Sequence, residues 1–348
     1  MQQQRDFHAT INIVTWNSEE YIEDLLKSLE AQTFLGFHII VIDNASSDKT
    51  LEIIGQHKNI TLIKNSSNIG FSRAHNKGIE MALKFWQGKD LSDRSIVVLN
   101  PDVVLKENCL EELLKSIYRN QDVAIMGPKL LRIYEEEIDN LSHKSKSNIV
   151  DSLGIEIFKS RKTIDIFSGQ EDPRTLKMQE VFGMSGAFMC IRANALDAIK
   201  YKKEYFDENF FAYKEDIDLC WRFRNLGWKI MINPEAVAYH YRRVRGGIKR
   251  SVLERFNNQK NKPQIIKFLS TRNHLWTIWK NDFLNNFIVH LPFIIFRELG
   301  KLSYVLFFDV KTIKAYFSAI LGLPKILQKR KYLKNAKIAP KEIREWMR

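Results

Sequence analysis

The chain has 348 residues, of which 45% are hydrophobic and 27% charged, a balance that excludes a disordered or fibrous protein and allows a large core. Its formal net charge of +13 favours a polyanionic partner, which can be nucleic acid, an anionic membrane or a phosphorylated substrate. Three cysteines, Cys109, Cys190 and Cys220, lie far apart without zinc-site spacing, which suits a reducing compartment.

The N-terminal half predicts alternating strands and helices. The first residues show no basic segment followed by an apolar one, so we expect no signal peptide and a cytoplasmic address. A strand is predicted at 10–15 and a helix start at 16–20, with Asn17 as N-cap and Glu20 three residues later. The pattern continues as strand 37–42, a helix capped near Asp48, strand 60–63, a helix through 79–83, strand 95–99, helix 108–118 and a strand near 123–126.

Polar segments follow three of these strands. Asp43 comes directly after one, the loop 68–73 after the next, and Asp102 after the strand that ends at Leu99. Ligands of open parallel sheets bind at the carboxyl ends of the strands. We therefore expect the three segments to converge on one cleft.

The pattern weakens between Arg132 and Gln179, where we expect a flap or a small hairpin insertion. The segment 180–191 follows, and its small residues, among them Ser185 and Gly186, allow close backbone approach to a ligand. Further strands are predicted at 228–232 and 236–240.

An acidic stretch at 213–222 predicts a loop that brings carboxylates to a helix start. Glu215 and Asp216 lie at the N-terminal end of that helix, and Gly227 stands where its C-cap is expected. Acids in a first turn are also favoured by the helix dipole alone, which is the competing explanation.

Asp102, His240 and the basic run after it suggest a site for a metal and a diphosphate. A hard cation takes oxygen ligands and shares them with phosphate, so Asp102 with a nucleotide diphosphate suffices, although Asn100-Pro101-Asp102 can also be an ordinary turn. His240 can complete the site or be a structural histidine. Arg243 and its neighbours Arg242 and Arg245 can bind oxyanions or form a solvated loop.

The segment 275–323 is rich in aromatic and aliphatic residues interrupted by single charges. No window reaches the roughly 20 apolar residues that span a bilayer. The segment predicts either an interfacial membrane helix pair or a helical cap over the core, and the lysine-rich tail after it favours anionic lipid headgroups.

The ordered set of these motifs resembles the family 2 glycosyltransferases of the GT-A fold, most closely their rhamnosyltransferase branch, over residues 11–245. The motifs that carry the resemblance are Val14-Thr15-Trp16-Asn17, Asp43-Asn44-Ala45-Ser46, Asn68-Ile69-Gly70-Phe71, Leu99-Asn100-Pro101-Asp102, Gly183-Met184-Ser185-Gly186-Ala187 and the stretch 210–219. The resemblance implies a Rossmann-like α/β mixed sheet flanked by helices, as a catalytic domain at 1–250, with a helical, membrane-proximal region at 251–348.

The resemblance also implies roles for individual residues. Asp216, with Glu215 beside it, would be the catalytic base, while Asp102 and His240 would hold Mg²⁺ or Mn²⁺. Asn100 departs from the first aspartate of the family's Asp-X-Asp motif, which leaves its ribose contact open, and the processive members' Gln-X-X-Arg-Trp motif is absent. The residues implied to bind the nucleotide sugar are Thr15, Asn17, Asp43, Asn68, Gly70, Arg73, Asn100, Ser185, Gly186 and Arg243.

These expectations combine into a cytoplasmic, membrane-associated inverting glycosyltransferase that moves L-rhamnose from dTDP-L-rhamnose to a cell-surface polysaccharide or lipid-linked glycan. A UDP-hexose or UDP-N-acetylhexosamine transferase is the alternative within the fold, and a catalytically silent glycan-binding scaffold is the alternative outside enzymes. No recognisable motif supports a nucleic-acid partner. No Gly-X-Gly-X-X-Gly follows the first strand, as a dinucleotide dehydrogenase requires.

Overall fold

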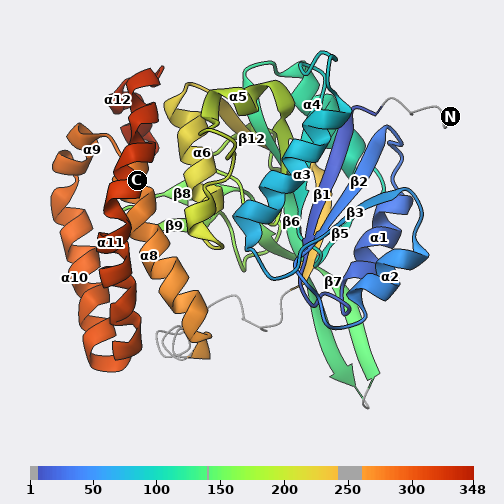
Figure 1. Cartoon of the computed structure of the whole chain (residues 1–348), viewed down its shortest axis with the longest axis horizontal. Helices are drawn as coiled ribbons and strands as arrows, with labels where there is room; N and C mark the ends of the chain where they lie inside the picture. The colour runs from blue at the N-terminus through green and yellow to red at the C-terminus, as the bar shows by residue number, and fades with distance from the viewer. Residues whose placement is uncertain (1–6, 139–140, 242–260) are drawn as a thin grey trace.

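The computed structural model describes residues 7–138, 141–241 and 261–348, and a ten-stranded mixed sheet forms its centre (Figure 1). The strands lie in the order β10-β12-β6-β11-β4-β1-β2-β3, with β5 paired to β12 and β7 to β6. Their bounds are β1 Ala9–Thr15, β2 Phe37–Asp43, β3 Ile60–Lys64, β4 Ser95–Leu99, β5 Val103–Leu105, β6 Val123–Ile138, β7 Leu141–Ser152, β10 Gln179–Glu180, β11 Phe188–Arg192 and β12 Lys229–Tyr241, and a separate two-stranded sheet joins β8 Ile155–Ile157 and β9 Thr163–Asp165.

The sheet changes direction at β11. Strands β4, β1, β2 and β3 are mutually parallel, whereas β11 is antiparallel to both β4 and β6. Thr15 at the end of β1 pairs with Asp43 at the end of β2, so the loops after these strands leave from one edge. The mixed α/β fold and the shared edge predicted from the sequence are both confirmed.

Helices cover both faces of the sheet because their apolar stripes face two separate cores. One core packs α1, α2 and α4 on the sheet, and the other packs α3, α5 and α6 on the opposite face. Burial of these stripes, at about 25 cal/mol per Å² of apolar surface, is the main force that holds the layers together. The helix bounds are α1 Ile22–Glu30, α2 Thr50–Gln56, α3 Phe71–Phe85, α4 Cys109–Arg119, α5 Leu196–Ile199 and α6 Glu215–Asn225.

Two local predictions were wrong. Helix α1 begins at Ile22 rather than near Asn17, because the Ser18 carbonyl accepts from the backbone N–H groups of Tyr21 and Ile22 and forms a turn there. Asn17 has a φ of +51° and turns its side chain to the loop after β2 instead. The two strands predicted near 228–240 are one strand, β12, with a register shift between Asn233 and Val237.

The segment between Arg132 and Gln179 forms two hairpins, as the sequence predicts. The long hairpin of β6 and β7 extends beyond the body of the molecule, and β8 with β9 lies beside α6 (Figure 1).

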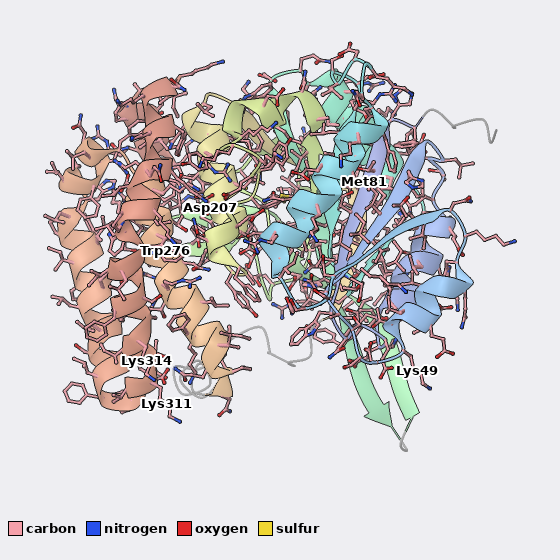
Figure 2. All side chains as sticks on the ribbon, viewed as in Figure 1. Lys49, Met81, Asp207, Trp276, Lys311 and Lys314 are labelled. Atoms are coloured by element: carbon pink, nitrogen blue, oxygen red, sulfur yellow. The ribbon has the colours of Figure 1, made fainter. Side chains whose placement is uncertain are left out.

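The C-terminal helices stand side by side at one flank of the sheet and pack on α6 through α8 (Figure 1). Lys280 of α8 lies 2.7 Å from Asp207 and 2.9 Å from Asp218, and Lys329 lies 2.5 Å from Asp207. Figure 2 labels Asp207 and, on α8, Trp276, close to where the C-terminal helices meet the rest of the molecule. The bounds are α8 Gln264–Asn281, α9 Leu284–Val289, α10 Leu291–Phe308, α11 Ile313–Lys329 and α12 Pro340–Glu345.

Nowhere in the described part of the chain does a helix have both the length and the apolar character that crossing a bilayer requires.

Candidate active site

A cavity of about 480 Å³ opens where the sheet edge, helix α6 and the β8–β9 hairpin meet. Residues that the sequence predicted for the site line this cavity, although they are up to 140 positions apart in the sequence. They are Asn100, Ser185, Gly186, Glu215, Asp216 and His240. Lys214 and Thr163 form another part of its wall.

The loop before α6 holds its acids in place through an unusual backbone. Phe211, Tyr213 and Lys214 have φ values of +66°, +70° and +74°, which cost about 1 kcal/mol or more each for residues with a Cβ. The buried amide of Asn273 on α8 donates to the carbonyls of Phe210, Ala212 and Tyr213 at 2.7–2.9 Å. The strained loop is therefore fixed by a side chain from the C-terminal region.

Asp216 and Glu215 lie side by side at the first turn of α6. The Asp216 carboxylate accepts from the N–H of Gly186 at 3.1 Å and from the N–H of Ile217 at 2.7 Å. Glu215 is 6% exposed, and burial together with the charge of Asp216 raises its pKa to about 8. At neutral pH Glu215 is therefore protonated.

The third carboxylate of the acidic stretch is structural. Asp218 is fully buried and accepts from Arg222, Lys280 and Asn281. A buried carboxylate requires such partners. The helix-dipole explanation does not account for these three contacts.

Asp102 contacts His240, which also lines the cavity. Nε2 of His240 lies 3.2 Å from Oδ1 of Asp102, and Nδ1 lies 2.8 Å from Oδ2 of Asp151. Burial would lower the pKa of His240, but the two carboxylates outweigh it and raise that pKa to about 9. Asp151 is buried and is also 3.4 Å from Nε of Arg132.

The residues at this point suit a divalent cation. Asp102 offers a buried carboxylate oxygen, and His240 would offer an imidazole nitrogen once a cation displaced its proton. Asp151 orients the ring as outer partners of metal-binding histidines do. Within residues 7–138, 141–241 and 261–348, no three His, Cys, Asp or Glu side chains form a complete metal cluster. The remaining ligands would come from a nucleotide diphosphate.

Thr15, Asp43 and Asn17 form a hydrogen-bonded layer at the ends of β1 and β2. Asp43 is buried and accepts from the hydroxyl of Thr15 at 2.9 Å and from that of Ser46 at 2.5 Å. Asn17 accepts from the N–H of Ser47 at 2.8 Å. The Asp43 carboxylate is thus held rigidly by its neighbours.

The loop before α3 is held by side-chain packing as well as by hydrogen bonds. Asn68 accepts from the N–H of Gly70, and a Cβ on Gly70 would lie 2.6 Å from the ring of Phe211. Arg73 donates to Glu208 at 2.8 Å and does not line the cavity. Arg243 lies outside the described residues, so its predicted contact with the nucleotide stays a prediction.

Sequence reasoning missed Asp151 and Asn273. Asp151 falls in a segment whose pattern is weak, and Asn273 is one amide in a long helix. No local motif marks either residue, because their partners are about 60 to 90 positions away.

Comparison with known proteins adds relatives of stated activity. The N-acetylglucosaminyl-diphospho-decaprenol L-rhamnosyltransferase of Mycobacterium tuberculosis is 26% identical over 236 residues, 66% of this chain and 74% of that protein. Rhamnosyltransferase WbbL of Escherichia coli is 27% identical over 235 residues, 66% and 82% of the two chains. The low-salt glycan biosynthesis hexosyltransferase Agl10 of Haloferax volcanii is 27% identical over 216 residues, and the match spans 62% of this chain and only 61% of that protein.

Solved structures support the fold. The crystal structure of Staphylococcus aureus TarS 1-349 matches with a TM-score of 0.53 at 14% identity, covering 97% of this chain and 90% of that one. GalNAc-T7 with UDP, GalNAc and Mn²⁺ matches with a TM-score of 0.56 at 14% identity, covering 79% and 48%. The fold is therefore GT-A. Residues 10–199, more than half of the sequence, match the family described as glycosyl transferase family 2, and the chain belongs to that family.

Proposed function

We propose that the chain is an inverting glycosyltransferase that moves L-rhamnose from dTDP-L-rhamnose onto a cell-surface polysaccharide or a lipid-linked glycan. The observation that carries the proposal is the cavity lined by both Asp216 and His240, with Oδ1 of Asp102 lying 3.2 Å from Nε2 of His240. The sugar and the nucleotide are suggested by relatives named as rhamnosyltransferases at 26% and 27% identity.

Asp216 acts as the general base in this proposal. Its carboxylate faces the cavity and takes the proton of the acceptor hydroxyl as the oxygen attacks the anomeric carbon. The Gly186 N–H donates to the Asp216 carboxylate and holds it in place, while Glu215 stays protonated beside it. A base on the face opposite the leaving diphosphate gives inversion.

Asp102 and His240 would hold Mg²⁺ or Mn²⁺ together with the diphosphate of the sugar donor. When bound, the cation neutralises charge on the leaving diphosphate. Asn100, Ser185 and Gly186 line the same cavity and would contact the sugar donor there. We assign the remaining nucleotide contacts to Thr15, Asn17, Asp43, Asn68, Gly70, Arg73 and Arg243.

UDP-N-acetylglucosamine is the second sugar donor to consider. The N-acetylglucosaminyltransferase TarS of S. aureus is 35% identical over 122 residues, 34% of this chain and 21% of that protein. Thymine and uracil differ only by a ring methyl group, so a carboxylate such as Asp43 would accept equally from either base.

The test is release of nucleoside diphosphate from a panel of dTDP-, UDP- and GDP-sugars with Mg²⁺ or Mn²⁺, with and without EDTA. Slow, metal-dependent turnover of dTDP-L-rhamnose is the expected result. If only a UDP-sugar were turned over, that sugar would replace dTDP-L-rhamnose as the proposed donor. No turnover and no nucleotide binding by calorimetry would overturn the transferase proposal in favour of the silent scaffold.

We place the reaction in the cytoplasm at the inner face of the cell membrane, where lipid-linked acceptors would be met. In this arrangement we assign residues 1–250 to the catalytic domain and 251–348 to a C-terminal region whose described helices support it, because α8 both packs on α6 and fixes the loop before Glu215.

A further inference from the structure

Most of the large apolar side chains that the described structure exposes lie on α9, α10 and α11, on the flank away from the sheet (Figure 1). We call this the outer face. Phe296, Phe307 and Leu321 are 83%, 80% and 83% exposed, so these rings and chains stand almost wholly in solvent. Its other members are Leu284, Ile288, Val289, Phe293, Ile295, Leu299, Leu306, Phe308, Val310, Phe317, Ile320 and Leu327. Exposed apolar side chains gathered on neighbouring helices in this way mark an interaction surface.

The charges around the outer face are mostly positive. Residues 291–341 contain eleven lysines and arginines and only two carboxylates, Glu298 and Asp309. Both carboxylates are paired within the chain, Glu298 with His274 and Asp309 with Lys267. Lysines 311, 314, 325, 331 and 334 are exposed, and Figure 2 shows Lys311 and Lys314 at one end of the helices.

A groove opens within the outer face. Its volume is about 270 Å³, and it lies between α8, α10 and α11. Leu275 and Trp279 form its floor on α8, and Ile295, Leu299 and Ile320 on its rim are 46–61% exposed. Apart from Glu298 and Tyr316 its lining residues are apolar, which suits a hydrocarbon chain better than a polar ligand.

We propose that the outer face docks on an anionic lipid bilayer, with its apolar side chains in the interface, its lysines on the headgroups and one acyl chain in the groove. An apolar surface accompanied by exposed lysines matches such a bilayer in both respects. A second copy of the chain matches less well, because two copies would bring like charges together.

Docking would place the catalytic cavity near the bilayer, because one helix, α8, borders both sites. Ser270 lines the catalytic cavity, and Leu275 and Trp279 line the groove. This consequence rests on the proposed function, whereas the docking itself needs neither sugar donor nor acceptor.

Flotation of the full chain with vesicles tests the proposal. We expect binding to phosphatidylcholine vesicles that contain phosphatidylglycerol, and binding that is at least ~10-fold weaker without the anionic lipid. The double variant Phe296→Ser, Phe307→Ser should bind at least ~10-fold more weakly. Leu35→Ser is the matched control, since Leu35 is 79% exposed but lies before β2, away from the outer face.

Charge reversal separates the lysines from the apolar contacts. Lys311→Glu with Lys314→Glu should weaken binding to the anionic vesicles, whereas Lys84→Glu with Lys115→Glu, on exposed positions of α3 and α4, should change it little. A circular-dichroism melt shows that each variant is folded. Equal binding of all variants would overturn the proposal, as would a parent chain that ignores vesicles and sediments as a dimer that the phenylalanine variants dissociate.

Binding of an acyl chain in the groove can be measured separately. Lipids brominated on the acyl chain should quench the fluorescence of Trp279, and the quenched component should be missing in Trp279→Phe. Unchanged quenching in that variant would remove the acyl chain from the groove while leaving the outer face to the flotation result.

Discussion

Nδ1 of His240 lies 2.8 Å from Oδ2 of Asp151, and this contact turns the other ring nitrogen toward Asp102. Outer partners of this kind fix the orientation of a metal-binding imidazole. Asp151→Asn should therefore weaken Mn²⁺ binding, measured by electron paramagnetic resonance in the presence of dTDP, by about 10- to 100-fold.

Asp197→Asn, on an exposed position of α5, is the control for that experiment. Because Asp151 also lies near Arg132, the variant's melting temperature must be recorded. A folded Asp151→Asn chain with unchanged Mn²⁺ affinity would show that His240 does not serve as a ligand through this contact.

Asp216→Asn should nearly abolish sugar transfer. An amide cannot take the acceptor proton, and loss of a general base typically costs about 10²- to 10⁴-fold in rate. Affinity for the nucleotide sugar, measured by calorimetry, should stay close to that of the parent because no nucleotide contact is assigned to Asp216. Full activity in the variant would take Asp216 out of the mechanism.

Glu215 should make stability depend on pH. Its pKa is raised from 4.5 to about 8 in the folded chain, so between these values the native state keeps a proton that the unfolded state has lost. The free energy of unfolding therefore falls as the pH rises through this window.

The Glu215→Gln variant lacks this pH-dependent loss of stability. Its free energy of unfolding minus that of the parent should therefore be higher at pH 8 than at pH 5, by roughly 2–4 kcal/mol. Denaturant titrations at both pH values measure the difference. Glu52→Gln, at an exposed position of α2, is the control. A Glu215→Gln chain that follows the parent at both pH values would contradict the raised pKa.

Lys280 joins the C-terminal helices to the acidic stretch, and Lys280→Met should lower the free energy of unfolding by about 3 kcal/mol. The reason is that Asp207 and Asp218, both buried, each lose a cation at less than 3 Å. Lys325→Met, on an exposed position of α11, should change stability little. Equal denaturation midpoints for the two variants would count against the buried pairs as a source of stability.

Gly70→Ala tests whether Gly70 serves packing or the nucleotide. Its φ of +84° and the 2.6 Å approach of a Cβ to Phe211 predict a loss of stability of roughly 2 kcal/mol or more. Gly88→Ala is a matched control, since its φ is +79° with open space around it, and it isolates the backbone strain from the clash. Lower nucleotide affinity with an unchanged melting temperature would favour a direct nucleotide contact instead.

Local patterns in the sequence predicted the repeating strands and helices, and the order of its motifs predicted the fold. The strands β1, β2 and β4 are buried on both faces. Such strands can be recognised in a sequence as continuous apolar runs. The edge that carries Asp43 and Asp102 follows from parallel pairing alone. The N-cap at Asn17 was mispredicted because a tertiary contact with Ser47 took its side chain.

What the sequence by itself determined is therefore the strands of the sheet, the edge that carries Asp43 and Asp102, and the two acids at the start of α6, because these follow from patterns within a few residues. Only the tertiary structure decided that Glu215 is protonated, that Asp218 is structural and that Asp151 and Asn273 support the site. The physical reason is that burial and partner charges arise between segments far apart in the chain, and they fix both the pKa of a carboxyl and the direction in which a side chain points.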